Sequence, residues 1–160
     1  MKHNKKNGRQ LAREYALQAL YEWYYTQNPS NDIIKHIIEN LMEDRNTTNY
    51  KSINRNYFDK LVTGSISNID TLDRLMQPHL DRSINSLNPI ELAVLRLAIF
   101  ELSRCFDVPY RVVINEALEL TKRFGSEQGH RYVNAVLDAL APSLRKAEFK
   151  ENRERRPITR

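Results

Sequence analysis

The sequence has few of the residues that break or cross-link a chain. Its single cysteine, Cys105, excludes an internal disulfide and makes a reducing cytoplasm the natural setting. Only four glycines occur in 160 residues, which leaves long segments uninterrupted. No segment approaches the ~18 consecutive apolar residues of a membrane helix, and no apolar stretch follows the basic amino terminus as in a secretory signal. These absences predict a protein without a membrane segment.

The motifs of common catalytic and cofactor sites are also lacking. Neither GxxxxGK[ST] nor GxGxxG occurs, so no nucleotide cradle is predicted. The four histidines lie far apart and never take metal-ligand spacing with a cysteine or carboxylate. Cys105 ends an apolar segment, where a buried structural thiol is expected rather than a nucleophile. We therefore expect no cofactor, no metal and no enzymatic activity.

Positive charge is concentrated at the two ends of the chain. Of the net charge of +5, residues 1–13 contribute +5 and residues 145–160 contribute +4, which leaves the body between them at −4. Basic ends on a mildly acidic body indicate a polyanionic partner. Charge alone equally allows two solvated tails that aid solubility.

Hydrophobic periodicity predicts an all-α protein, because apolar residues recur at helical spacing and sustained strand-like alternation is absent. We expect a compact bundle of about seven helices in two packed halves. The principal helices are predicted at 9–26, 33–42, 54–77, from 89 onward, at 110–124 and at 127–140, with a polar loop over 44–53.

Several helix ends have recognisable signals. Asn88 suits an N-cap, Pro89 suits the first helical position, and Glu91 stands where a capping-box acid would reach back. The apolar segment that follows predicts a central helix buried on all sides. Gly125 suits a left-handed C-cap behind an inward-facing Phe124, and Pro142 is expected to end the last helix.

Three regions follow from these observations. Residues 1–8 form a basic amino-terminal arm, residues 9–144 a helical domain, and residues 145–160 a charged tail that we expect to be disordered. Met1 at the start and the polar end at Arg160 favour a complete chain over a fragment.

Three stretches carry a resemblance to a known family. They are RQLAREYALQALYEW at 9–23, NPIELAVLRLAIFEL at 88–102, and DVPYRVVINEALELTKRFGSEQGHRYVNAVLDAL at 107–140. In this order and spacing they resemble the transcription antitermination factor NusB family over most of residues 9–142. The match is weakest over residues 27–56 and in the tail.

The resemblance implies a helical RNA-binding protein without a cofactor. Members bind the boxA element of nascent single-stranded RNA as a complex with NusE, a small-subunit ribosomal protein. Within the RNA polymerase antitermination complex they promote read-through, notably of ribosomal RNA operons. Members are monomers or dimers, so the resemblance leaves a homodimer open.

The first helix is where the resemblance places RNA-contacting basic residues. Arg9 and Arg13 are four residues apart and should share one exposed edge of this helix. Such an edge can follow a phosphate backbone, with arginine making bidentate contacts. Helix composition alone also fits a solvated face. The predicted RNA-binding residues of this helix and the arm before it are Lys5, Lys6, Arg9, Gln10 and Arg13.

The start of the last helix supplies a second predicted RNA contact. Arg131 can bind a phosphate, and Tyr132 can stack on an unpaired base. Packing in the core is an equally good interpretation of Tyr132.

Two residues match family positions near the NusE contact. Tyr21 offers apolar area with a hydroxyl, and Glu91 offers an acid to a basic ribosomal protein. Tyr21 also suits the core, and Glu91 also suits the capping role.

Two other functions stay open. Similar helical domains occur fused to RNA cytosine methyltransferases, although this chain contains no cofactor-binding segment. A helical scaffold that binds only protein is the other, and it predicts no RNA affinity even with a partner present.

Overall fold

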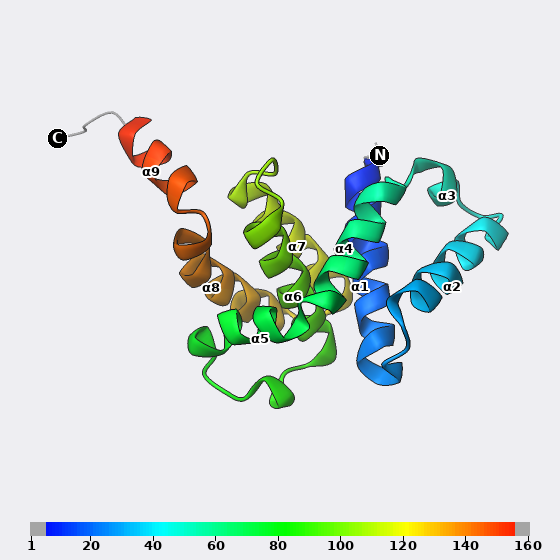
Figure 1. The fold of residues 1–160 in the computed structure, drawn as a ribbon, viewed down its shortest axis with the longest axis horizontal. Coiled ribbons are helices and arrows are strands. Elements are labelled where there is room, and N and C mark those ends of the chain that lie inside the picture. The colour runs from blue at the N-terminus through cyan, green and yellow to red at the C-terminus, as the bar shows by residue number, and fades with distance from the viewer. Residues whose placement is uncertain (1–5, 156–160) are drawn as a thin grey trace.

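The computed structural model describes residues 6–155, in which helices joined by short loops occur and no strands (Figure 1). Its elements confirm the predicted all-α class. In chain order they are α1 (Gly8–Thr26), α2 (Ser30–Glu43), α3 (Asn49–Ser52), α4 (Arg55–Ser67), α5 (Ile69–Met76), η1 (Gln77–His79), η2 (Ile84–Ser86), α6 (Pro89–Arg104), α7 (Tyr110–Phe124), α8 (Glu127–Leu144) and α9 (Lys146–Arg155).

Two halves share one hydrophobic core. In the first half α1 packs against α2 and α4, and in the second half α5, α7 and α8 pack around α6 (Figure 1). Contacts of α6 with α1 and α4 join the halves. As predicted, α6 is the central helix, because 11 of its 16 residues are buried.

Some helix boundaries differ from the prediction. The helix expected over 54–77 is two helices, because the Asn68 side chain donates to the Gly64 carbonyl at 2.7 Å where α4 ends. The predicted loop 44–53 contains the short helix α3. Asn88 caps α6 through the Ile90 N–H at 2.8 Å, but no capping box with Glu91 forms.

The end of α7 was predicted wrongly in two respects. Gly125 is extended rather than left-handed, with φ −112°, and its N–H donates to the Thr121 carbonyl at 2.8 Å. Phe124 is 44% exposed instead of facing inward. Residues 122–124 at the end of α7 are therefore exposed, whereas Thr121 in the same turn is buried.

The carboxyl-terminal region is more ordered than the sequence suggests. Pro142 lies inside α8 instead of ending it. A proline at this position removes the N–H that would donate to the Asp138 carbonyl. The helix tolerates this loss because Pro142 and Asp138 are both exposed, so water can reach the carbonyl. Residues 146–155, predicted to be disordered, form α9, which extends beyond the end of α8 (Figure 1). Arg145, the first residue of the expected tail, is buried.

Candidate nucleic-acid interface

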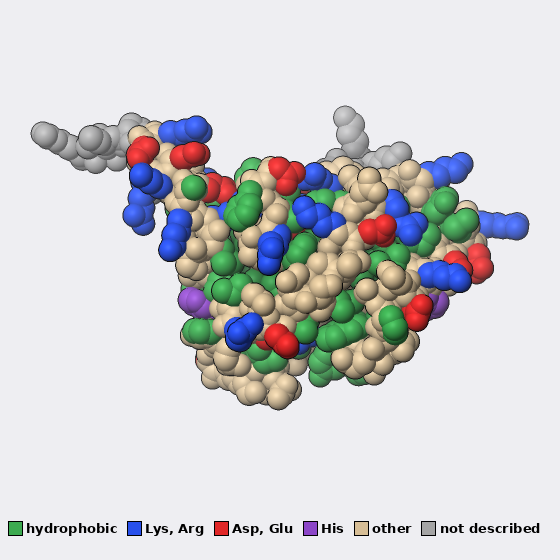
Figure 2. Space-filling model, viewed as in Figure 1, with side chains coloured by type: hydrophobic (Ala, Val, Ile, Leu, Met, Phe, Trp, Pro, Cys, Tyr) green, Lys and Arg blue, Asp and Glu red, His purple; other side chains and the backbone are tan. Residues whose placement is uncertain are grey.

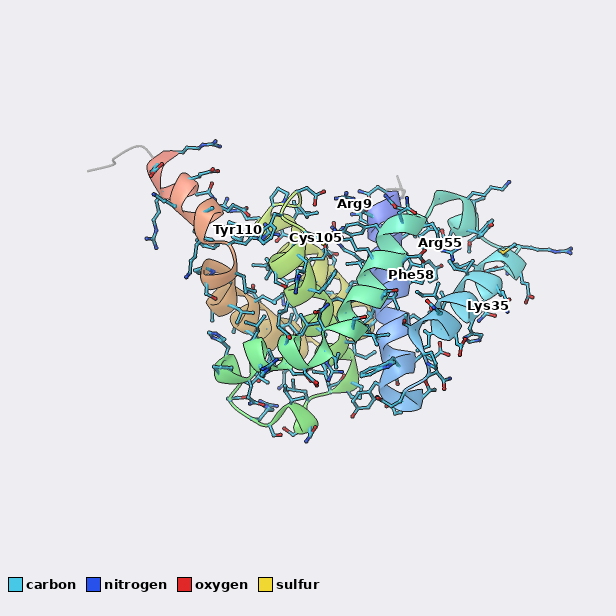
Figure 3. The ribbon with its side chains drawn as sticks, viewed as in Figure 1. Arg9, Lys35, Arg55, Phe58, Cys105 and Tyr110 are labelled. Atoms are coloured by element: carbon cyan, nitrogen blue, oxygen red, sulfur yellow. The ribbon has the colours of Figure 1, made fainter. Side chains whose placement is uncertain are left out.

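The start of α1 and the turn between α6 and α7 lie at the same edge of the molecule (Figure 1). Arg9 joins them, since its Nη2 lies 3.1 Å from Asp107 Oδ2. The Arg9 guanidinium also lies over the Tyr57 ring, 4.4 Å from its centroid. At 41% exposure the Arg9 side chain remains open to a ligand. Figure 3 shows Arg9 at this edge, near the start of α1.

Gln10 makes hydrogen bonds at this edge that its position in the sequence did not predict. Its N–H donates to Asn7 Oδ1 at 2.8 Å, and its Oε1 accepts from the Asn7 N–H at 3.0 Å, which completes a capping box. Its Nε2 donates to Glu116 of α7 at 2.9 Å. Gln10 therefore fixes the start of α1 and ties it to α7.

Lys6 belongs to a second cluster, together with a cation that the sequence analysis missed. Lys6 Nζ lies 2.6 Å from Glu14 Oε2, and Arg123 Nη1 approaches the same oxygen at 3.1 Å. Arg123 comes from the last turn of α7, and its guanidinium covers the ring of Phe124 at 4.8 Å. Helical periodicity offered no signal for its proximity to α1. Lys5 lies outside the described residues.

Arg13 is not on an exposed edge, and this prediction was wrong. Its side chain is 6% exposed and forms a bidentate ion pair with Glu101, at 2.7 Å and 3.0 Å. The spacing of Arg9 and Arg13 does place both on one side of α1, but α4 and α6 cover that side from Arg13 onward. Arg13 thus lies buried behind this edge, with its guanidinium committed to Glu101.

The environment of Glu101 explains why this buried charge is tolerated. The Tyr57 hydroxyl donates to Glu101 Oε2 at 2.6 Å, so the carboxylate has three donors. Burial, followed by the charge and hydrogen bond of Glu101, raises the pKa of Tyr57 well above its usual value. Burial disfavours the charged form of Arg13, but the hydrogen bond and charge of Glu101 outweigh it and raise the pKa of Arg13. Both groups keep their protons at neutral pH.

Arg131 and Tyr132 stand at the start of α8. The Arg131 side chain is 80% exposed and 3.8 Å from Glu127, a loose surface pair. Tyr132 is half-buried against the core, and the Arg82 guanidinium covers its ring at 4.8 Å. Its hydroxyl is shielded from water without a hydrogen-bond partner in the described part of the chain. Tyr132 therefore contributes to packing, and a base could stack on the covered face of its ring only in place of Arg82.

These residues form two groups rather than one. Asp107, which contacts Arg9, precedes the amino-terminal end of α7, and Arg131 follows its carboxyl-terminal end. A helix of 15 residues is about 22 Å long, so one nucleotide cannot bridge both groups. Arg123 contacts the α1 cluster through Glu14 from the last turn of α7, and Arg131 follows it in the second turn of α8.

Tyr21 and Glu91 lie on neighbouring surfaces. Tyr21 is 38% exposed and lines a groove of about 340 Å³ with Ile90, the residue before Glu91, and Phe124. The Glu91 carboxylate instead packs over Gly129 of α8, where an added Cβ would lie 2.3 Å from Glu91 Oε1. The groove thus includes Tyr21 but not Glu91, whose carboxylate faces α8.

Charges on the visible face are mixed. Figure 2 shows Lys and Arg side chains interspersed with Asp and Glu side chains rather than gathered in one basic patch. Within residues 6–155 no three His, Cys, Asp or Glu side chains are arranged to hold a metal ion. No helix in that range is both long and apolar enough to cross a membrane.

Comparison with known proteins identifies the family. The NusB family model matches residues 10–142. A transcription antitermination protein NusB of Coxiella burnetii (strain Dugway 5J108-111) is 49% identical over 138 residues, which cover 86% of this chain and 95% of the relative. The NusB of Pasteurella multocida (strain Pm70) is 47% identical over 144 residues, covering 89% of this chain and 95% of the relative.

Solved structures agree with the sequence relatives. T. maritima NusB superposes with a TM-score of 0.74 at 28% identity, covering 91% of this chain and 99% of that one. A crystal structure of the antitermination factors NusB and NusE in complex with dsRNA superposes with a TM-score of 0.71 at 27% identity, covering 84% and 96%. The predicted resemblance is confirmed: this chain belongs to the NusB family, whose named relatives are transcription antitermination proteins.

Proposed function

We propose that this protein is a non-catalytic subunit of an antitermination complex in the bacterial cytoplasm. It binds the boxA element of nascent RNA together with NusE and promotes read-through of ribosomal RNA operons. The observation that carries the proposal is that solvent-accessible cations lie on three elements around α7: Arg9 beside its start, Arg123 in its last turn, and Arg131 on α8 next to the half-buried Tyr132. A structural neighbour that binds NusE and dsRNA supports it.

Each group has its own part in this proposal. Arg9 and Lys6 hold phosphates, and these contacts fix the position of the strand without reading its sequence. Base recognition falls to the α8 group, where an aromatic ring can stack on an unpaired base. Tyr21 faces NusE from the groove beside Ile90, and Glu91 faces it from the adjoining first turn of α6. Lys5 extends the cationic arm, and Gln10 shapes the start of α1.

A protein-only scaffold is the second candidate, and one observation favours it. Lys6 and Arg9 are each paired with a carboxylate of the protein itself, Glu14 and Asp107. Cations that are already paired attract a phosphate less strongly than free ones. The scaffold predicts NusE binding without RNA binding.

The test is a titration of a labelled single-stranded RNA that carries a boxA-like element, with and without NusE, at two salt concentrations. A scrambled RNA of equal length is the control. We expect selective binding that NusE strengthens and that weakens steeply with salt, because phosphate contacts release counterions. Equal weak binding of both RNAs, unaffected by NusE, would exclude the proposed function. Binding of NusE alone would establish the scaffold.

A further inference from the structure

The Asp107 carboxylate is paired with the guanidinium of Arg9, the exposed cation of the α1 edge that we propose as a phosphate-binding residue. The two side chains meet at 3.1 Å, and their exposed fractions are 61% for Asp107 and 41% for Arg9. The hydrogen bond from Arg9 lowers the pKa of Asp107, so this carboxylate is ionised at neutral pH. A guanidinium binds carboxylate and phosphate through the same N–H donors. Asp107 and an RNA phosphate therefore compete for one site.

The turn that carries Asp107 is held in a fixed shape. The Arg145 guanidinium is buried beneath it and donates to four backbone carbonyls at 2.6–3.1 Å. The accepting residues are Glu101, Leu102, Cys105 and Val108. Because these acceptors flank Asp107 on both sides in the chain, the carboxylate is presented to Arg9 from a rigid support rather than from a loose loop.

The carboxylate of the neighbouring cluster, Glu14, is less easily replaced by a phosphate than Asp107 is. Glu14 is 17% exposed and holds both Lys6 and Arg123, so a phosphate that contacts either of these exposed cations does so beside Glu14 and not in its place. The Asp107 side chain, in contrast, is exposed, so water can hydrate its carboxylate when that carboxylate leaves Arg9. Surface ion pairs of this kind contribute little to stability. Replacement of Asp107 by a phosphate is therefore feasible without unfolding any part of the edge.

We infer that Asp107 sets the RNA affinity of this protein by occupying Arg9 until a phosphate displaces it. This inference rests on the proposed function and deepens it. RNA that offers only phosphates must displace the carboxylate with no other gain, whereas RNA with base contacts at the α8 group gains binding free energy elsewhere. Asp107 thereby keeps the free protein from binding RNA indiscriminately.

The test is a double-mutant cycle on the complete protein with NusE. Wild type, Asp107→Asn, Arg9→Ala and the double variant are titrated with the boxA-like RNA and with the scrambled RNA at two salt concentrations. Asp59→Asn is the matched control, because Asp59 forms an exposed pair with Arg55 at 3.0 Å on α4 and its substitution removes the same charge. Arg55 and Asp59 line a hollow with Lys35 of α2, and neither belongs to the Arg9–Asp107 pair (Figure 3). Melting temperatures of all variants report on the fold.

We expect Asp107→Asn to raise RNA affinity about two- to fivefold at low salt, the range of one surface ion pair, and Asp59→Asn to change it much less. In the Arg9→Ala background Asp107→Asn should bring no gain. An equal gain from both carboxylate variants, or a gain that survives without Arg9, would reduce the effect to net charge and overturn the inference. Reduced affinity would show that Asp107 positions Arg9 for RNA. If the wild-type protein binds no RNA, the proposed function itself is wrong. If the wild type binds RNA and Asp107→Asn leaves the RNA affinity unchanged, only this inference is wrong.

Discussion

Arg13 and Glu101 form a buried bidentate ion pair across 88 residues of sequence, with Nε–Oε1 and Nη2–Oε2 distances of 2.7 Å and 3.0 Å. The pair joins α1 of the first half to α6 of the second. Tyr57 of α4 completes it through its hydroxyl, and its ring supports Arg9 at the surface. The exposed edge of α1 is thus backed by a polar cluster inside the core.

Arg13→Ala should destabilise the protein by about 3–5 kcal/mol, because it leaves the Glu101 carboxylate buried and uncompensated. Urea denaturation followed by circular dichroism measures the change. Arg9→Ala is the comparison variant and should cost little stability, since its pair with Asp107 is exposed. A stable Arg13→Ala protein with lost RNA affinity would return Arg13 to the RNA surface.

Arg123→Ala should lower RNA affinity by about 1 kcal/mol and reduce the salt slope by about one ion, as expected for the loss of one phosphate contact. Fluorescence anisotropy at several salt concentrations measures both. Arg74→Ala on α5 is the control, because Arg74 is an exposed arginine that contacts only residues of its own helix and is not among the proposed RNA-binding residues. Equal effects of the two variants would show that only net charge matters.

Tyr132→Phe should leave stability within about 1 kcal/mol of wild type, because the deleted hydroxyl is shielded and unpartnered. Its RNA affinity should persist, since the ring remains. Tyr132→Leu keeps apolar volume but loses the aromatic face, and should weaken RNA binding by about 1–3 kcal/mol. Thermal melting and anisotropy separate the two effects. If Tyr132→Leu binds RNA normally, Tyr132 is a packing residue alone.

Gly64→Ala should destabilise by about 1–3 kcal/mol through overpacking, although alanine favours helix. A Cβ at this position would lie 2.2 Å and 2.4 Å from two ring carbons of the buried Phe100, where α4 crosses α6. Thr63→Ala, exposed on the same helix, is the control and should be nearly neutral. Calorimetric melting of both variants provides the measurement. An unchanged Gly64→Ala melting temperature would mean that the two helices can separate without cost.

Arg145→Ala should cost about 3 kcal/mol, because several buried carbonyls lose a charged donor at once. Truncation after Arg145 should cost less. It removes Glu148, which accepts from the Tyr110 N–H at 2.9 Å, and Phe149, which stacks on Tyr110 at 4.3 Å. Urea unfolding of the two proteins ranks them. Truncation as damaging as Arg145→Ala would assign the stability to α9 instead.

The sequence by itself determined the helical class, the family and the positions of the long helices. Apolar periodicity placed α1, α6 and α7 closely, because an amphipathic stripe repeats over several turns and depends only on neighbouring residues. Caps were less predictable. Asn88 was identified, whereas the Asn7–Gln10 capping box and the break at Asn68 were missed, since each depends on one side chain choosing among several acceptors.

The candidate site shows the same division more sharply. Helical spacing correctly placed Arg9 and Arg13 on one side of α1, but only the packing of α4 and α6 decided that one is exposed and the other buried. The partners lie far away in sequence, 98 residues for Arg9 with Asp107 and 88 for Arg13 with Glu101. Periodicity reports which side of a helix a residue occupies. Which helices cover that side depends on how the helices cross. Only the tertiary structure could therefore show which cations are exposed at the surface and which are buried.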